Sequence, residues 1–361
     1  MPHKAEIRAR ASQLRAAFET AGAHPVETSV LLPAEVLLDL YGEDIRARAY
    51  VTSDSLRGEQ MLRPDFTVPV VQMHMDHGAE PARYTYSGEV FRRQEDDSDR
   101  ANEYTQVGYE VFDRENPAAA DAEVFALFQK TLTPLNLRAA TGDIGVLKAA
   151  VLGLETTDAR KRALLRHIWR PRRFRALMDR FSGVTPVPPS RAALLAQDTP
   201  MAHEFPVIGM RTTEEISARI DALKDDAAAA PLAEGQVALI DALLGVREAM
   251  PFALEHLRDI AVDMPAITEA VFRLKDRMDA LAALGVDVEA LDFEANYGRT
   301  QMEYYDGFVF GFYAADRPDL PPVATGGRYD ALTRVLGQGR SIPAVGGVIR
   351  PGLMLEVEGA L

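Results

Sequence analysis

The side chains best suited to binding chemistry alternate along residues 104–112. In a β-strand, successive side chains point to opposite faces. One face would carry Thr105, Val107, Tyr109 and Val111, which suit a core, and the other would carry Tyr104, Gln106, Gly108 and Glu110. The glycine leaves room for a small molecule against the backbone. Glu110 can accept a hydrogen bond from a cationic ring or an ammonium group, and Gln106 can both donate and accept.

Two further segments repeat this pattern of glycines between polar and aromatic residues. One face of 84–92 carries Tyr84, Tyr86, Gly88 and Arg92, and one face of 303–313 carries Glu303, Tyr305, Gly307, Val309 and Gly311. Arg92 is suited to a carboxylate, and Tyr305 offers a stacking surface and a hydroxyl group. Together the three faces predict the floor of a pocket for a zwitterionic amino acid. Phosphate fits less well, because the loop after 84–92 contains Glu95, Asp96, Asp97 and Asp99.

Hydrophobic periodicity and turn residues predict the elements that would position these side chains. Helices are expected over 3–22, from an Asn116 N-cap to about 132, over most of 143–290, and over 351–358. Strands are expected over 82–92, 104–112, 303–314 and 343–349, with a short strand ending at Thr325. Residues 326–330 should open a helix through a tight turn close to a ligand. The alternative to a pocket is that each strand has a solvated polar face.

The order of strands, then helices, then strands predicts an α+β fold with an antiparallel sheet. We expect a core formed by residues 1–150 and 286–361, and a mostly helical insertion over 151–285. The regular alternation of strands and helices that marks a parallel sheet is absent from the sequence.

Composition narrows the class of protein further. The 361 residues include 47% hydrophobic residues, carry a formal net charge of −14 and contain no cysteine. A general attraction to nucleic acid or anionic membranes is therefore not expected, and neither are disulfides or cysteine metal sites. The charged N-terminal residues do not form a signal peptide, and no stretch is long and apolar enough for a membrane span. We expect a cytoplasmic protein.

Four ordered motifs carry a resemblance to the histidyl-tRNA synthetases. Residues 62–67 (Leu-Arg-Pro-Asp-Phe-Thr) resemble a conserved segment of that family, and 88–93 with 106–110 resemble its class II motif 2. Residues 303–307 and 326–330 resemble its histidine-binding segments. The resemblance covers about 40–130 and 300–350, and it implies a class II aminoacyl-tRNA synthetase-like sheet flanked by helices.

The departures from this family concern nucleotide chemistry. Thr300 stands where the synthetases have an arginine, although Arg299 is adjacent, and Gln94 replaces a motif 2 glutamate. Leu353 occupies the place of the ATP-binding arginine, with Arg350 three residues earlier. Adenylation needs fixed positive charge on the phosphates, worth about 3 kcal/mol per preorganised donor. An anticodon-binding domain is also not expected in this chain. A pocket that holds histidine without activating it is the resulting interpretation.

This profile resembles the family of ATP phosphoribosyltransferase regulatory subunits. The resemblance implies a non-catalytic, dimeric scaffold in a hetero-oligomer with a short-form catalytic subunit. Such a subunit activates its partner and mediates feedback inhibition by L-histidine in the first step of histidine biosynthesis. No cofactor and no metal are implied. The predicted histidine-binding residues are Asp65, Thr67, Arg92, Gln106, Glu110, Tyr304 and Tyr305.

Charge suggests a role for most of these residues. Asp65, Thr67 and Gln106 would hold the α-amine, Glu110 and Tyr305 the imidazole, and Arg92 the carboxylate. Two alternatives remain: a truncated histidine-activating, ATP-dependent ligase, and an RNA-binding remnant that uses the basic segment 160–180. That segment also fits a solvated helix face or a partner-binding surface. His74 and His77 have helical metal-site spacing but no third clustered ligand, so a non-metal role is expected.

Overall fold

The computed structural model describes residues 2–41, 45–46, 48–94, 100–198, 200–201, 208–299 and 304–359. Its strands are β1 (His24–Pro25), β2 (Leu31–Pro33), β3 (Val51–Asp54), β4 (Gly58–Leu62), β5 (Ala82–Phe91), β6 (Glu103–Phe112), β7 (Arg138–Asp143), β8 (Arg247–Ala249), β9 (Asp292–Glu294), β10 (Phe308–Tyr313), β11 (Ala324–Arg328) and β12 (Ala344–Ile349). Its α-helices are α1 (Lys4–Thr20), α2 (Ala34–Tyr41), α3 (Thr67–His77), α4 (Pro117–Leu132), α5 (Ile144–Gly153), α6 (Asp158–Arg166), α7 (Pro171–Phe181), α8 (Pro189–Leu195), α9 (Thr213–Ala228), α10 (Glu234–Gly245), α11 (Met250–Asp263), α12 (Thr268–Ala283), α13 (Asp330–Leu336) and α14 (Pro351–Glu358).

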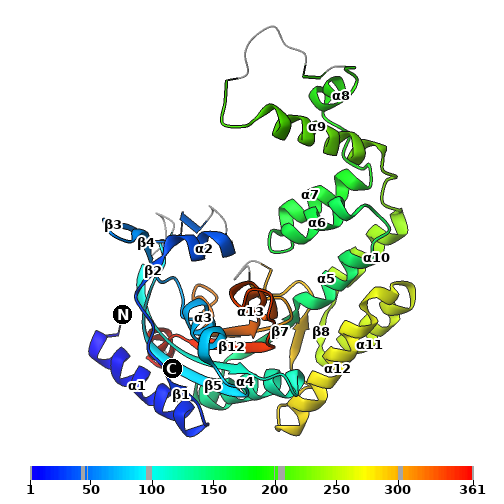
Figure 1. The fold of residues 1–361 in the computed structure, drawn as a ribbon. Coiled ribbons are helices and arrows are strands. Elements are labelled where there is room, and N and C mark those ends of the chain that lie inside the picture. Colours follow the sequence, from blue (N-terminus) through cyan, green and yellow to red (C-terminus); the bar gives the residue numbers. More distant parts are fainter. Residues whose placement is uncertain are drawn as a thin grey trace.

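A large sheet organises the molecule (Figure 1). Among the described residues it has nine strands, in the order β1-β5-β6-β12-β11-β10-β7-β9-β8. The neighbours from β5 through to β7 are all antiparallel. The pairs β1–β5 and β7–β9 are parallel, and the edge pair β9–β8 is antiparallel. A separate small sheet has the order β2-β4-β3. The central antiparallel strands confirm the predicted α+β class.

The register of the central strands places the three predicted faces on one side of the sheet. Residues directly opposite each other across a ladder share a face. Gly108 lies opposite both Tyr86 of β5 and Val348 of β12, and Glu110 lies opposite Gly346. Across β11, the same side continues through Gly327 to Val309 of β10. Side chains that are far apart in the sequence therefore border one shared surface.

The other side of the sheet is the hydrophobic core. Val107, Tyr109 and Val111 are fully buried, as their alternation predicted. The ring of Phe18 from α1 stacks on Phe128 of α4, with 5.5 Å between ring centroids. Helices α1, α4 and α12 line this side, which is the lower one in Figure 1, and α13 lies on the upper side. Burial of this face fixes which residues of β6 point toward the site.

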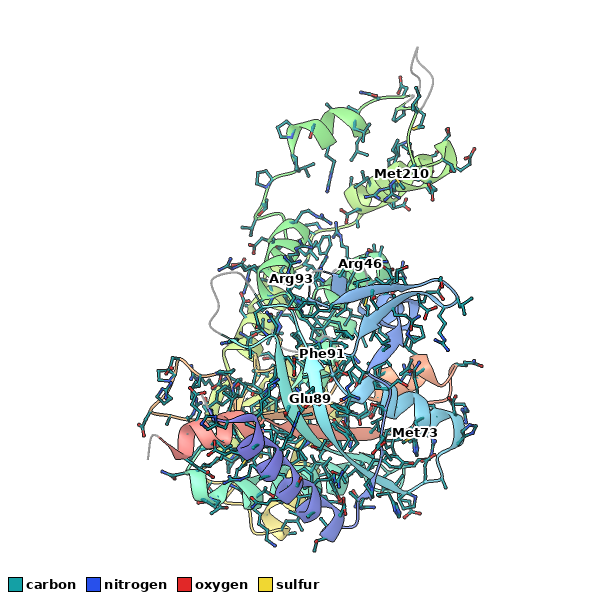
Figure 2. The ribbon with its side chains drawn as sticks, turned by 90° about the vertical axis from the view of Figure 1, so that its left-hand side faces the viewer. Arg46, Met73, Glu89, Phe91, Arg93 and Met210 are labelled. Atoms are coloured by element: carbon teal, nitrogen blue, oxygen red, sulfur yellow. The ribbon has the colours of Figure 1, made fainter. Side chains whose placement is uncertain are left out.

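The helical region after β7 packs on the sheet at its near end and projects away at its far end. Arg277 of α12 is buried and pairs with Asp121 of α4 at 2.8 Å and with Asp143 at 2.9 Å. These paired charges hold α12 against the sheet's helical layer. Helices α8 and α9 lie farthest from the sheet (Figure 1). Figure 2 shows Met210 at the end of this extension, and its side chain is fully exposed.

Several predicted elements are confirmed with small shifts. Helix α1, strands β5 and β6, strand β12 and helix α14 lie where the patterns placed them. Asn116 caps α4, since its side chain accepts a hydrogen bond from the Ala119 backbone N–H at 3.0 Å. The described part of 303–314 becomes a strand only from Phe308.

The tight turn expected at 326–328 is wrong, because these residues form part of strand β11. Gly326 is needed there for close packing within the sheet. A Cβ atom at this position would lie 2.3 Å from the Phe310 ring and 2.5 Å from the Gly346 carbonyl oxygen. Strands β7, β8 and β9 also lie next to or within the region predicted as mostly helical. Across the described helices, none has the length and apolarity that a membrane crossing requires.

Candidate functional site

Glu110 of β6 is the centre of the candidate site and is fully buried. Its Oε1 accepts hydrogen bonds from the hydroxyls of Thr67 at 3.1 Å and Tyr86 at 2.7 Å. Its Oε2 accepts a hydrogen bond from the Tyr329 hydroxyl at 2.5 Å. A carboxylate offers about four acceptor positions. Three neutral donors from the described residues therefore leave room at this carboxylate for one further donor.

Burial raises the pKa of Glu110 to about 7, although its three hydroxyl partners act in the opposite direction. The negative charge of Asp65 contributes to the rise. Near neutral pH the carboxyl group is therefore only partly ionised, and a cationic ligand would favour its ionised form.

Two glycines make space for this arrangement. A Cβ atom at Gly346 would lie 1.5 Å from Glu110 Oε2, and one at Gly108 would lie 2.0 Å from the Tyr86 ring. Any side chain at these positions would occupy the volume that Glu110 and Tyr86 now fill. The glycines predicted from alternation as pocket-clearing residues thus make room first for site side chains.

Gln106 lies on the same face of β6 and is 1% exposed. Both its Nε2 and its Oε1 are buried without a hydrogen-bond partner in the part of the chain that the structure describes. Opposite it on β5 is Gly88, which carries no side chain that could satisfy it. Buried amides are normally hydrogen-bonded, so the two polar atoms of Gln106 are suited to a polar group that enters this cluster.

The segment 62–67 brings two predicted residues to the Glu110 carboxylate. Phe66 stacks on Tyr86 with 4.4 Å between ring centroids, which fixes the start of α3 against β5. Thr67, the first residue of α3, then reaches Glu110. Asp65 is 2% exposed and accepts a hydrogen bond from the Val68 backbone N–H at 3.3 Å. Two acidic groups therefore lie close together in a buried site.

Tyr304 and Tyr305 approach from the segment before β10. Their rings meet edge to face with 4.9 Å between centroids, and Tyr304 also meets the Tyr329 ring at 6.1 Å. Burial and the nearby Glu110 carboxylate raise the pKa of Tyr305, so its hydroxyl stays protonated. Trp169, which precedes α7, donates a hydrogen bond from Nε1 to the Tyr305 backbone carbonyl at 3.3 Å. The helical region thus contacts the site directly.

Arg92 lies just beyond β5, and its Nε donates a hydrogen bond to the Pro64 carbonyl oxygen at 2.7 Å. Figure 2 shows the neighbouring Glu89, Phe91 and Arg93 following one another along this end of the strand. Arg350, directly after β12, is close enough to Arg92 for the two charges to interact. All seven predicted residues therefore border one site, and that they bind histidine stays a prediction.

Three neighbours in this site were not among the predicted ligands. The Tyr86 and Tyr329 hydroxyls bind Glu110, and Arg350 adds a second guanidinium beside Arg92. Alternation along 84–92 already placed Tyr86 on the site face. The positions of Tyr329 and Arg350 depend on the packing of β11 and β12. The acidic residues 95–99, Thr300 and Glu303 lie outside the described residues.

Two other arginines have structural partners. Arg328 pairs with Asp121 at 2.7 Å and with Asp330 at 3.0 Å. Arg299 donates a hydrogen bond from Nε to the Ile168 carbonyl oxygen at 2.7 Å and lies over the Phe174 ring. The Arg299 side chain therefore contacts the helical region. Burial, with a smaller effect of Arg175, lowers the pKa of Arg299 to about 10.

Some basic residues of the segment 160–180 are paired within the helical region, and others are exposed. Arg160, Arg175 and Arg180 form ion pairs with Asp226 or Asp241. The remaining exposed members are Arg162, Arg166, Arg172 and Arg173. His74 is buried, stacks on Phe112 and bonds with the Tyr84 hydroxyl at 3.1 Å, whereas His77 is exposed. A search of the described residues finds no group of three acidic or histidine side chains arranged to hold a metal.

The chain is similar in sequence to a known family and to named members of it. The histidyl-tRNA synthetase family profile matches residues 1–197 and 213–351. The chain is 32% identical over 356 residues to an ATP phosphoribosyltransferase regulatory subunit of Agrobacterium fabrum, covering 93% of each chain. It is 31% identical over 354 residues to the protein of the same name from Brucella ovis, covering 92% of this chain and 93% of that one.

Comparison with solved structures supports the fold. A Bacillus halodurans protein described as an ATP phosphoribosyltransferase regulatory subunit/histidyl-tRNA synthetase superimposes with a TM-score of 0.69 at 21% identity, covering 98% of this chain and 79% of the other. A histidyl-tRNA synthetase from Nostoc gives a TM-score of 0.65 at 17% identity, covering 98% of this chain and 72% of the other. These similarities confirm the synthetase-like fold.

Proposed function

Because the chain belongs to the family of ATP phosphoribosyltransferase regulatory subunits, we propose that it binds L-histidine in the Glu110 site and thereby inhibits a catalytic subunit. The observation that carries the proposal is the buried amide of Gln106, which has no described partner although it lies on the same strand face as Glu110. A zwitterion with a polar ring supplies donors and acceptors to groups of this kind.

The chemistry of each end of histidine suits a different part of the site. Asp65, Thr67 and the oxygen of Gln106 accept hydrogen bonds and would hold the α-ammonium group. Glu110 and the Tyr305 hydroxyl would hold the imidazole, with Tyr304 packing at its side. Arg92 would bind the carboxylate through its guanidinium group. The paired acidic groups favour a ligand that brings positive charge.

The chain's single tryptophan gives a direct readout of occupancy, since Trp169 bonds to the backbone of Tyr305. We expect L-histidine to change Trp169 fluorescence saturably in the wild-type chain. Glu110→Gln should weaken histidine binding by about 10- to 100-fold, because a charge-assisted hydrogen bond is lost. It should also raise the histidine concentration needed to inhibit the assembled enzyme.

Glu123→Gln is the matched control for this variant. Glu123 also accepts a tyrosine hydroxyl, from Tyr109 at 2.7 Å, but on the core side of the sheet. Its substitution should leave the histidine affinity unchanged. Equal affinities in wild type and Glu110→Gln would refute the assigned role of Glu110.

The free energy of unfolding should depend on pH through the titration of the Glu110 carboxyl group. The pKa of Glu110 in the folded protein is about 7, above its ordinary value of 4.5, so the protonated carboxyl group favours folding. This contribution is fully present below pH 4.5. This contribution is lost as the pH rises to about 7, and the total change is about 3 kcal/mol. Urea unfolding from pH 4.5 to 8 should therefore show a steeper fall for empty wild type than for Glu110→Gln. Parallel curves for the two proteins would contradict the raised pKa.

We further propose that the chain is non-catalytic and assembles, as a dimer, with a short-form catalytic subunit that it activates. Its relatives' name, regulatory subunit, supports this assignment. Co-purification of the two chains followed by native mass measurement tests the assembly. Robust pyrophosphate exchange with histidine and ATP would instead favour a histidine-activating ligase.

A further inference from the structure

Arg350 continues the alternation of β12 toward the candidate site. Gly346 and Val348 lie opposite Glu110 and Gly108 and share their face of the sheet. Arg350 is the next residue in this alternation and follows directly after the strand, which places it beside Gln106. The site face therefore runs from the acidic Glu110, past the amide of Gln106, to a basic end.

The Arg350 guanidinium is held in a fixed position. Its Nη1 donates to the Pro322 carbonyl oxygen at 2.8 Å, and its Nη2 donates to Thr325 Oγ1 at 3.2 Å. These two bonds use neutral acceptors, so they position the group without neutralising its charge. A guanidinium has five N–H donors, and further ones remain for another acceptor.

Among the described residues, the groups that act on the charge of Arg350 are a second cation and two tyrosines. Burial and the Arg92 guanidinium lower the pKa of Arg350, whereas Tyr104 and Tyr305 act in the opposite direction. Two neighbouring guanidinium groups repel each other, and the side-chain hydrogen bonds described for Arg350 go to neutral oxygens. An anion bound at Arg350 would offset this repulsion and the cost of burying its charge.

We propose that Arg350 acts with Arg92 to bind the α-carboxylate of the amino-acid ligand, so that a free carboxylate is required for binding. This inference rests on the proposed function. It adds a specificity-determining residue that the family motifs do not provide, because the motif comparison places Leu353 at the arginine position.

The neighbourhood favours a carboxylate over a phosphate. Asp65 and Glu110 both act on Tyr305, which in turn lies beside Arg350. A zwitterion places its ammonium group close to its carboxylate and can satisfy both charges at once. A phosphate would bring two negative charges toward these acidic groups without a compensating positive charge.

The test compares L-histidine with L-histidinol, in which a hydroxymethyl group replaces the carboxylate. Both ligands are titrated into the full-length wild-type chain and into Arg350→Met, with Trp169 fluorescence as the readout. Arg350→Met should weaken histidine binding by about 10- to 100-fold and change histidinol binding by less than about threefold. The ratio of the two affinities therefore reports on Arg350 independently of general damage to the site.

Two further variants separate binding from folding. Arg114 also donates to a backbone carbonyl, that of Ser341 at 3.0 Å, so Arg114→Met controls for loss of such a bond elsewhere. Arg350→Lys keeps the charge and should retain part of the preference for histidine over histidinol. If Arg350→Met does not fold, the affinity ratio measured in Arg350→Lys decides, and an unchanged ratio counts against the inference.

The possible results distinguish failure of the Arg350 inference from failure of the proposed function. An unchanged histidine-to-histidinol ratio in Arg350→Met would overturn this inference and leave the proposed function intact. Competition by inorganic phosphate that Arg350→Met abolishes would assign the arginine pair to phosphate and also overturn it. Absence of histidine binding to wild type, both alone and in the complex with the catalytic subunit, would overturn the proposed function together with this inference.

Discussion

Replacing Gln106 with leucine is expected to abolish detectable histidine binding and to make the empty protein more stable. The amide is 1% exposed, and neither of its polar atoms has a described partner. A buried amide without hydrogen bonds costs about 1–3 kcal/mol, and leucine removes this penalty at similar volume. The free energy of unfolding in urea should therefore rise by about that amount. Trp169 fluorescence should no longer respond to histidine.

Gln60→Leu is the matched control for this prediction. Gln60 is also buried, but its Nε2 donates to the backbone carbonyls of Arg57 and Glu59 at 3.2 and 3.1 Å. The same substitution there should reduce stability and leave histidine binding unchanged. A Gln106→Leu protein that is less stable than wild type, or that still binds histidine, would contradict a role of this amide in hydrogen bonding to the ligand.

The second large effect is expected at Gly346. An alanine Cβ would lie 1.5 Å from Glu110 Oε2 and 2.8 Å from the Tyr109 carbonyl oxygen, so the Glu110 side chain must move. Its hydrogen bonds from Tyr86 and Tyr329 then break in a buried site. We expect Gly346→Ala to lower the free energy of unfolding by about 2–4 kcal/mol and to eliminate histidine binding. Urea unfolding and fluorescence titration measure the two effects.

A double variant distinguishes this clash from general intolerance of alanine in β12. Removing the Glu110 side chain makes space, so Gly346→Ala should be less harmful in a Glu110→Ala background than in wild type. Gly235→Ala, in the first turn of α10 with open space around the glycine, should instead stabilise by about 0.4–1 kcal/mol. Additive effects of Gly346→Ala and Glu110→Ala would contradict the steric explanation.

Local patterns in the sequence were sufficient for much of the fold. The alternation along 104–112 separated the core face of β6 from its site face, and both Tyr109 and Glu110 lie as it predicted. The Asn116-Pro117 pair marked the start of α4. These signals are local, because a cap or an alternation depends on residues a few positions apart.

Features that depend on long-range packing were not predicted. Strands β8 and β9 have three residues each, which is too short for a periodic pattern. The glycines of β11 have the composition of a turn, and only their close neighbours show why a strand needs them. The positions of Arg350 and the Tyr329 hydroxyl depend on the register of β12 and β11 against β6. The boundaries of the helical insertion stay a prediction.

The turn between α6 and α7 contacts the chain at two residues, Arg299 and Tyr305. Arg299 bonds to the Ile168 carbonyl, and Trp169 bonds to the Tyr305 carbonyl. A displacement of these helices would therefore pull on the backbone that carries Tyr305. Thermodynamic linkage makes such coupling reciprocal. If docking of another subunit shifts α6 and α7 and so weakens the grip on a ligand, that ligand must loosen the docking by the same factor.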